Sequence, residues 1–421
     1  MGNKISANLP RFAYAPSKQW YVLDENRGVW SEVEEVEIEK KIYVARGRKD
    51  ATAEKMVGAL KIQKYNGMED GKTLWQNSNI AKKRGNSVLF ADGHYDAKTG
   101  SFSKYSPDDF LLARHTLDHT YGKGFKGEAC PNWLRYLEEL FDGDAEKAGK
   151  IALLQEWFGY LLMPTAARQK SLIFLGVGSN GKGVITNRMK QVLGENRWVE
   201  KMLSEMLDRF SLRELNGKYA AFCPEMSRQD VVGADFKALT GGNSITAQQK
   251  YRQGQNTFLP FAKLVFSTNQ LPSIFQQGNA ITRRLAILEL TKVFNAVHGF
   301  ENQFDGETRG LLAWSLEGAR RLAANGDFTP VQSIADAVSR YVAAYDTVGQ
   351  FIDEEMKAKN RTSMKRSEFG KAYVARCKAN GTHSMPAASL YEKIRLEKLL
   401  VETRREGHYV FTLPPTKETK K

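Results

Sequence analysis

The chain has 421 residues, of which 42% are hydrophobic and 26% are charged. This composition excludes a globally disordered protein, and the length exceeds one ordinary core of about 150 residues, so we expect two to four domains. Lys and Arg number 62 against 48 Asp and Glu, and the net charge of +14 favours a polyanionic partner. Most of the excess lies in the last 65 residues, where 16 basic and 6 acidic side chains give +10.

The cysteines and the longest uncharged run bear on the compartment. Cys130, Cys223 and Cys377 are odd in number and far apart, so they fit neither a disulfide framework nor a thiolate zinc site. This usage favours a reducing, cytoplasmic setting. The uncharged run over 264–282 contains too many polar residues to span a bilayer, so neither a membrane helix nor a signal peptide is expected.

The first part of the chain, 1–125, is predicted to be an accessory α/β domain rich in turns. Apolar runs at 20–23 and 28–30 flank four polar residues and predict a hairpin. A strand over 88–90 is followed by Asp92 and Gly93, a pair typical of tight turns. Apolar residues then recur at helical spacing, which predicts a helical collar over 126–165.

The middle of the chain has the pattern of a parallel sheet covered by helices. Short apolar runs alternate with helical stretches there and occupy 172–175, 219–223, 264–266 and 285–288. We assign 166–300 to this α/β domain and expect the helical pattern of 301–345 to form a lid. The chain is therefore predicted to belong to the α/β class.

The basic segment 346–421 is predicted to be a winged-helix-like DNA-binding domain. Helical patterns cover 365–380 and 387–399, and a strand follows over 409–413. Two helices and a β wing are the components of a winged-helix module, and the local charge would contact phosphates of duplex DNA.

A glycine-rich loop lies between the first strand of the predicted sheet and a helix. It consists of Gly176, Val177, Gly178, Ser179, Asn180, Gly181, Lys182 and Gly183. Strand, loop and helix in this order are the context of a P-loop, in which backbone amides and the helix N-terminus hold phosphate oxygens. We therefore predict an ATP site at which Lys182 reaches the terminal phosphates.

Gly183 departs from the usual P-loop pattern, because a Ser or Thr hydroxyl normally binds Mg²⁺ at this position. The metal cofactor must be held in another way. Three ways stay open from the sequence, namely water molecules, a distant acid, or Thr186 one turn along the helix.

The order of these motifs resembles the superfamily III helicases, specifically the phage and plasmid primase-helicase family with its poxvirus-like helicase domain. The resemblance rests on Pro131-Asn132-Trp133, Leu154-Gln155-Glu156, Asn180-Gly181-Lys182, Leu215-Asn216-Gly217-Lys218, Gly241-Gly242-Asn243, Leu271-Pro272 and Arg283-Arg284. It implies an AAA+ P-loop ATPase core over 166–300 and a host cytoplasm as the location. Phe90-Ala91-Asp92-Gly93 resembles the accessory region that precedes such motors, so no primase domain is expected.

The resemblance also implies catalytic roles. Glu225, which follows Cys223 and Pro224 after a buried strand, would be the Walker B carboxylate that holds hydrated Mg²⁺ and activates water. Asn269 would sense the γ-phosphate. Arg283 or Arg284 would act as an arginine finger in the ATP site of a neighbouring subunit.

A β-rich stretch over 244–258, turning near Gly254, resembles the DNA-gripping hairpin of this family. Lys250, Tyr251 and Arg252 lie near the turn, and Lys237 precedes the stretch. A cation on phosphate beside an aromatic ring on a base is a combination that binds single strands.

Together these features predict an ATP-dependent DNA helicase of phage or plasmid replication, which assembles as a hexameric ring and translocates on single-stranded DNA. The expected partners are single-stranded and forked DNA and a separately encoded primase or polymerase. The alternative is an ATP-switched initiator that binds a replication origin, or a DNA-binding regulator, without processive unwinding.

Overall fold

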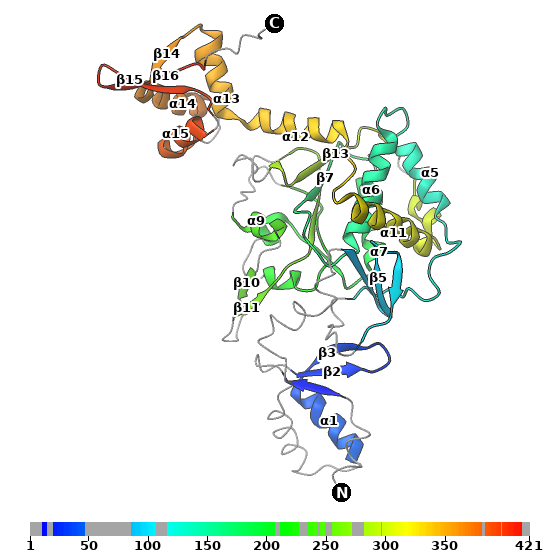
Figure 1. The fold of residues 1–421 in the computed structure, drawn as a ribbon. Helices are drawn as coiled ribbons and strands as arrows, with labels where there is room; N and C mark the ends of the chain where they lie inside the picture. The colour runs from blue at the N-terminus through cyan, green and yellow to red at the C-terminus, as the bar shows by residue number, and fades with distance from the viewer. Residues whose placement is uncertain are drawn as a thin grey trace. The chain divides into compact units, whose positions relative to one another are not determined.

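The computed structural model describes residues 11–14, 20–46, 86–106, 116–206, 211–226, 234–241, 245–248, 255–271, 282–295, 297–380, 384–396 and 398–414. Two units divide the chain, Met1–Ala337 and Val338–Lys421. Figure 1 shows their elements, from the N-terminal strands in blue to the C-terminal strands in red. Among the described helices none is both long and apolar enough to cross a lipid bilayer.

Two small antiparallel sheets begin the first unit. The first contains β1 (Phe12–Tyr14), β2 (Trp20–Asp24) and β3 (Val29–Val33), followed by α1 (Glu35–Arg46), and the second contains β4 (Ser87–Phe90), β5 (Gly93–Asp96) and β6 (Ser101–Ser103). The predicted hairpin and the predicted tight turn at Asp92 and Gly93 are both confirmed. Arg27 joins the sheets, because its Nε donates to the carbonyl of Ala91 at 2.9 Å.

The predicted collar helices pack against a helix from much later in the chain. These are α5 (Pro131–Leu140), α6 (Lys147–Leu161) and α11 (Thr308–Asn325). A Cβ on Gly159 of α6 would lie 2.2 Å from the backbone nitrogen of Ala319, and a Cβ on Gly318 of α11 would lie 1.9 Å from the Gln155 carbonyl oxygen. The two helices touch backbone to backbone, so both positions require glycine.

The buried carboxylate of Glu156 fixes the same helix pair. Its Oε1 accepts from Arg321 Nε at 2.7 Å and from Thr329 Oγ1 at 2.6 Å, and its Oε2 accepts from the Thr329 backbone amide at 2.6 Å. Glu156 is fully buried, so these donors replace the water it has lost. The segment around Glu156 therefore has a structural role in the fold.

A five-stranded parallel sheet forms the centre of the first unit. Its order is β13 (Leu285–Glu289), β7 (Ser171–Leu175), β12 (Lys263–Thr268), β9 (Ala220–Cys223) and β8 (Trp198–Glu200). All four pairings are parallel, which confirms the predicted sheet and its four strands. The fifth strand, β8, was not predicted.

Among the described residues, this unit also contains helical segments and a hairpin that follows α9. The helical segments are α7 (Lys182–Leu193), α8 (Leu203–Met206), η6 (Ser211–Leu215), α9 (Ala234–Gly241), η8 (Phe300–Phe304) and α12 (Gln332–Tyr345), the last of which crosses the boundary to the second unit. The hairpin pairs β10 (Ile245–Gln248) with β11 (Gln255–Phe258) in antiparallel register. All three cysteines are buried and reduced.

The second unit contains helices and a three-stranded antiparallel sheet. In chain order they are α13 (Thr347–Ile352), η9 (Asp353–Ala358), β14 (Ser363–Lys365), α14 (Arg366–Ala379), α15 (Ala387–Leu396), β15 (Val401–Arg405) and β16 (His408–Thr412), with sheet order β14-β16-β15. Phe351, Phe369 and Phe411 pack edge to face in its core, with ring centroids 4.9 and 5.3 Å apart. The two predicted helices and the last predicted strand are confirmed, whereas β14 and β15 were not predicted.

Candidate functional site

The loop between β7 and α7 depends on glycine at two positions. A Cβ on Gly176 would lie 1.9 Å from Asn180 Nδ2 and 2.4 Å from the Leu290 carbonyl oxygen. Gly181 has φ +83°, and a Cβ there would lie 2.1 Å from the hydroxyl of Tyr136. Asn180 is buried and donates from Nδ2 to the Leu290 carbonyl at 3.1 Å. The loop is therefore held against the end of β13 and against α5.

Lys182 begins α7, and its amine points back into the loop. Nζ donates to the carbonyls of Gly176 at 2.5 Å and Val177 at 3.0 Å, to Asn180 Oδ1 at 2.9 Å and to Asn269 Oδ1 at 3.2 Å. All four acceptors are uncharged, and burial lowers the pKa of Lys182. No charged group among these acceptors neutralises the Lys182 ammonium, so it could pair with an anionic ligand.

A cavity of about 270 Å³ lies beside Lys182, between α7 and the carboxyl ends of β9 and β12. Its lining consists of Lys182, Gly183, Thr186, Asn187, Lys190, Glu200, Phe222, Cys223, Pro224, Val265 and Ser267. Lys190 and Glu200 form an ion pair at 2.7 Å on one wall. In open parallel sheets, ligands bind outside the carboxyl ends of the strands, so the cavity has the expected location for one.

The hydroxyl of Thr186 lies next to the place where Gly183 lacks one. Thr186 Oγ1 is 3.1 Å from the Lys182 carbonyl oxygen and 3.0 Å from the Gly183 carbonyl oxygen, so it donates within its own helix and keeps its lone pairs. A Cβ on Gly183 would meet nothing within 4 Å. Steric crowding therefore does not explain why this position is a glycine.

Glu225 and Asn269 lie at the same edge of the sheet as Lys182. Glu225 follows β9 after Pro224, and Asn269 follows β12 directly; both side chains are exposed. The Cys223 thiol donates to the Glu225 carbonyl oxygen at 2.9 Å, which fixes the turn after β9. Since β12 pairs with both β7 and β9, all three predicted residues extend from neighbouring strand ends.

The donors around the cavity suit a hydrated magnesium ion. Mg²⁺ usually keeps several waters and takes one or two carboxylates together with phosphate oxygens. The hydroxyls of Thr186 and Ser267 line the cavity, and Glu225 follows its lining residue Pro224. This small set of oxygen donors fits an ion bound mainly through water and a nucleotide.

Arg283 and Arg284 lie at the opposite end of the strands, where the amino ends of the sheet are. The Arg284 carbonyl accepts from the Ser171 amide at 2.7 Å, which places it at the amino end of β7. The length of β7, roughly 16 Å for five residues, separates it from Gly176. Arg283 is exposed, whereas Arg284 is buried and donates to Gln169 Oε1 at 3.2 Å. Neither guanidinium belongs to the Lys182 site of its own chain.

The residues predicted to grip DNA fall largely outside the described part of the chain. The strands β10 and β11 confirm the hairpin, but Lys250, Tyr251 and Arg252 lie outside the described residues. Lys237 belongs to α9, and its side chain is likewise outside them.

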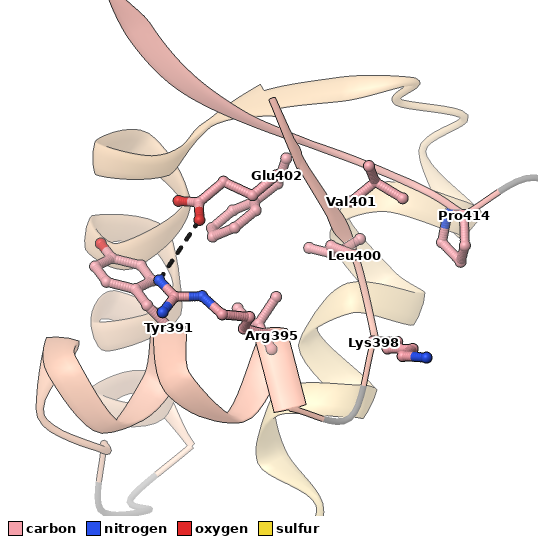
Figure 2. A pocket seen from close by; sticks show the side chains of 9 residues that line it. Tyr391, Arg395, Lys398, Leu400, Val401, Glu402 and Pro414 are labelled. Carbon is pink, nitrogen blue, oxygen red and sulfur yellow. Dashed lines mark ion pairs between the residues drawn. The ribbon is translucent and has the colours of Figure 1, made fainter. Parts of the chain in front are cut away.

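A second cavity, of about 480 Å³, lies in the C-terminal unit and was not predicted. Figure 2 shows it between the end of α15 and the strands β15 and β16. Its lining is Tyr391, Ile394, Arg395, Lys398, Leu400, Val401, Glu402, Phe411 and Pro414. No motif identifies this site, although the basic composition of the tail pointed to this unit.

Comparison with known proteins finds a family model and a curated viral protein that are similar to parts of this chain. The model "Family of unknown function (DUF5906)" matches residues 174–284, from β7 to Arg284. "Putative helicase 184R" of Invertebrate iridescent virus 6 is 22% identical over 236 residues, which cover 49% of this chain. The chain spans only 22% of the length of that viral protein.

Solved structures show the same fold over almost the whole chain. Two apo structures of the NrS-1 C-terminal region match 98% of this chain at 11% identity, with TM-scores of 0.53 and 0.50, and the match covers 98% and 97% of those chains. At this identity the likeness concerns the fold alone. The sequence match to the viral protein supports a helicase-like superfamily.

Proposed function

We propose that the protein is an ATP-dependent DNA helicase of the superfamily III, phage and plasmid replication type, with an AAA+ P-loop core. The contact between Lys182 and Asn269 carries this proposal, because it joins the predicted phosphate-binding amine to the predicted sensor at one sheet edge. The sequence match to the viral putative helicase supports a helicase role, and the NrS-1 C-terminal region shares the fold.

In this proposal the side chains at the sheet edge divide the work of hydrolysis. Lys182 exchanges the carbonyl oxygens of its loop for the terminal phosphate oxygens of ATP. Asn269 orients the attacking water, and Glu225 accepts its proton as the water oxygen bonds to the γ-phosphorus and the β–γ bridging bond breaks. Thr186, Ser267 and Glu225 are the residues that would hold Mg²⁺, which would neutralise charge on the phosphates when bound.

Arg283 or Arg284 acts in trans in this proposal. A full strand length separates the two arginines from the Lys182 site of their own chain, which supports action on the ATP of a neighbouring subunit. We propose that six subunits form a ring that brings such neighbours together. Arg283 is the better candidate for the finger, because its side chain is exposed and that of Arg284 is occupied by Gln169.

Two regions bind DNA in this proposal. The β10–β11 hairpin, with Lys250, Tyr251 and Arg252 between its strands and Lys237 before it, grips one strand in the pore. The C-terminal unit, which we propose to be a winged-helix-like domain built from its helices and three-stranded sheet, also contacts DNA. A separately encoded primase or polymerase would supply priming.

The decisive experiment compares Lys182→Ala with Lys147→Ala. Lys147 is a surface lysine paired with Glu138 on the collar, so its loss tests for a general effect of removing a lysine. We expect Lys182→Ala to abolish ATP hydrolysis and fork unwinding, and Lys147→Ala to keep both. Full unwinding by Lys182→Ala would overturn the assignment.

The rival function is an ATP-switched initiator that binds a replication origin. The observation that favours it is the basic composition of the C-terminal unit. A motor and a switch differ in their response to single-stranded DNA. Strong stimulation of ATP hydrolysis by single-stranded DNA, with duplex unwinding, supports the motor. Absence of both supports the initiator.

A further inference from the structure

Two tyrosine rings and two arginines alternate at the wing end of the C-terminal sheet. The guanidinium of Arg366 lies 4.2 Å from the ring centroid of Tyr391 and 5.4 Å from that of Tyr409, and Arg404 lies 6.0 Å from the Tyr409 ring. We name this row of Tyr391, Arg366, Tyr409 and Arg404 the wing ladder. Cation–π contacts of this kind hold a cation over the face of an aromatic ring.

The wing ladder carries more positive than negative charge. Arg366 forms an ion pair with Glu402 at 3.0 Å, and Arg395 approaches the other oxygen of the same carboxylate at 3.7 Å. The single Glu402 carboxylate thus pairs with two arginines, and Arg404, two positions further along β15, adds a third cation. The Arg395 side chain is 69% exposed and Tyr409 is 50% exposed, so both cation and ring are open to a ligand.

The cavity of the C-terminal unit adjoins the wing ladder. Tyr391 belongs to both, and Arg395 and Glu402 line the cavity, as Figure 2 shows. Its volume of about 480 Å³ falls within the range of small-ligand sites, about 300–1,000 Å³. Lys398 adds a further cation at its rim.

The helix that would enter a duplex groove in a winged-helix module is poorly equipped to read bases. The exposed residues in the first turns of α15 are Ala387, Ala388, Ser389 and Glu392. Base edges in the major groove are read mainly by Arg, Lys, Asn and Gln. Exposed cations of this helix occur only at its last turn, beside the wing ladder, where Arg395 lies.

We propose that the wing ladder and the adjoining cavity bind an unpaired nucleotide of a DNA single strand. A base stacks on the exposed ring of Tyr409, and the flanking phosphates contact Arg395 and Arg404. Stacking on an aromatic ring requires an unpaired base, because the faces of paired bases are covered by their neighbours. The C-terminal unit thereby recognises the single-stranded arm next to a fork rather than a duplex sequence. The inference rests on the proposed DNA function and identifies its substrate at this surface.

Binding titrations of the full-length chain without nucleotide test the proposal. A Lys250→Ala, Arg252→Ala background removes the cations of the proposed pore hairpin, and the probes are a fluorescein-labelled oligo(dT) strand and a blunt duplex of equal length. We expect Tyr409→Ala to weaken oligo(dT) binding roughly 5- to 100-fold and duplex binding less than about twofold. Tyr409→Phe keeps the ring and should bind oligo(dT) like the parent.

Two further measurements separate a direct contact from a structural effect. If Tyr409→Ala lowers the melting temperature, the comparison of Tyr409→Phe with Tyr409→Leu replaces it, because both variants keep an apolar side chain and only one keeps a ring. An oligonucleotide carrying 5-iodouracil, irradiated in complex with the protein, should form an adduct on Tyr409 that peptide mass spectrometry locates. Adducts on other residues alone, or equal losses for single strand and duplex, would overturn the proposal.

The test of the single-strand site and the test of the helicase function can fail separately. If Tyr409 variants weaken oligo(dT) binding but the protein neither hydrolyses ATP nor unwinds forks, the single-strand site stands and the helicase function is overturned. If the protein unwinds forks but Tyr409 variants bind oligo(dT) normally, the helicase function stands and the single-strand site is overturned.

Discussion

The amine of Lys182 donates to Asn269 Oδ1 at 3.2 Å, although the two residues belong to different βα segments of the parallel sheet. The contact places the Asn269 amide within reach of a phosphate that Lys182 would hold. We predict that Asn269→Ala lowers kcat for ATP hydrolysis about 100-fold, as loss of one preorganised polar group does in other active sites. Nucleotide affinity, measured with a fluorescent ATP analogue, should change much less.

Two further variants accompany Asn269→Ala. Asn269→Gln moves the amide away from Lys182 and should also hydrolyse ATP slowly. Gln270→Ala, at the next exposed position, is the control and should stay active. An Asn269→Ala enzyme with normal kcat would remove Asn269 from the site.

A second prediction concerns the hydroxyl at Thr186. If Thr186 takes the place of the residue missing at Gly183, Thr186→Ala should lose most of the difference between ATP affinity with Mg²⁺ and ATP affinity with EDTA. Thr186→Ser keeps the hydroxyl and should keep that difference. Binding by isothermal titration with and without Mg²⁺ measures both.

The open space at Gly183 allows a rescue experiment. A side chain there meets nothing within 4 Å, so Gly183→Ser should be tolerated and should restore the Mg²⁺ dependence lost in Thr186→Ala. An unaffected Thr186→Ala variant would mean that water or Glu225 holds the metal without Thr186, and a double variant that does not recover would mean that a hydroxyl at position 183 does not reach it.

A third prediction separates the two arginines before β13. Arg283→Ala should abolish hydrolysis without affecting folding, because its side chain is exposed. Arg284→Ala should lower the free energy of unfolding by about 1–2 kcal/mol, because it removes a buried group that donates to Gln169. Urea unfolding and ATP hydrolysis of each variant measure the two effects.

Mixing of inactive subunits tests the action in trans. Rings assembled from Lys182→Ala and Arg283→Ala chains contain some interfaces with an intact lysine and an intact arginine. Those interfaces should hydrolyse ATP, although each variant alone does not. No recovery on mixing would contradict an arginine finger at Arg283.

A fourth prediction concerns the stability of the first unit. Glu156→Ala removes the buried acceptor of Arg321 and Thr329, and leaving such donors unsatisfied should lower the free energy of unfolding by about 1–3 kcal/mol, because the Arg321 side chain is partly exposed. All seven tryptophans fall in residues 1–337, so tryptophan fluorescence during urea unfolding reports this unit. Glu138→Ala, which removes an exposed carboxylate, should change the midpoint little.

Strand prediction succeeded where burial made the pattern plain. The strands β7, β9, β12 and β13 lie inside a parallel sheet, and such strands read as continuous apolar runs. The strand β8 escaped because it has three residues, none of them fully buried. The strand β15 escaped because its Val-Glu-Thr-Arg-Arg sequence carries one apolar side chain.

The proximity of Lys182 and Asn269 was easier to predict from the sequence than the wing ladder, for a similar reason. Lys182 lies in a contiguous motif, and Asn269 ends a recognisable strand, so the rule that strand ends share one sheet edge brings them together. The wing ladder takes Arg366, Tyr391 and Tyr409 from three separate elements. Only the packing of α14, α15 and β16 makes them neighbours, and no local spacing encodes that packing.

The burial of all three cysteines has a practical consequence for measuring motion in this molecule. Native thiols shielded in this way react slowly with maleimide dyes, so a single engineered cysteine would carry nearly all of the label. Val177, which is 61% exposed beside Lys182, is a suitable position for a donor dye. Energy transfer from Val177→Cys to an acceptor-labelled nucleotide or oligonucleotide would then report occupancy of the loop in real time, without removing any native thiol.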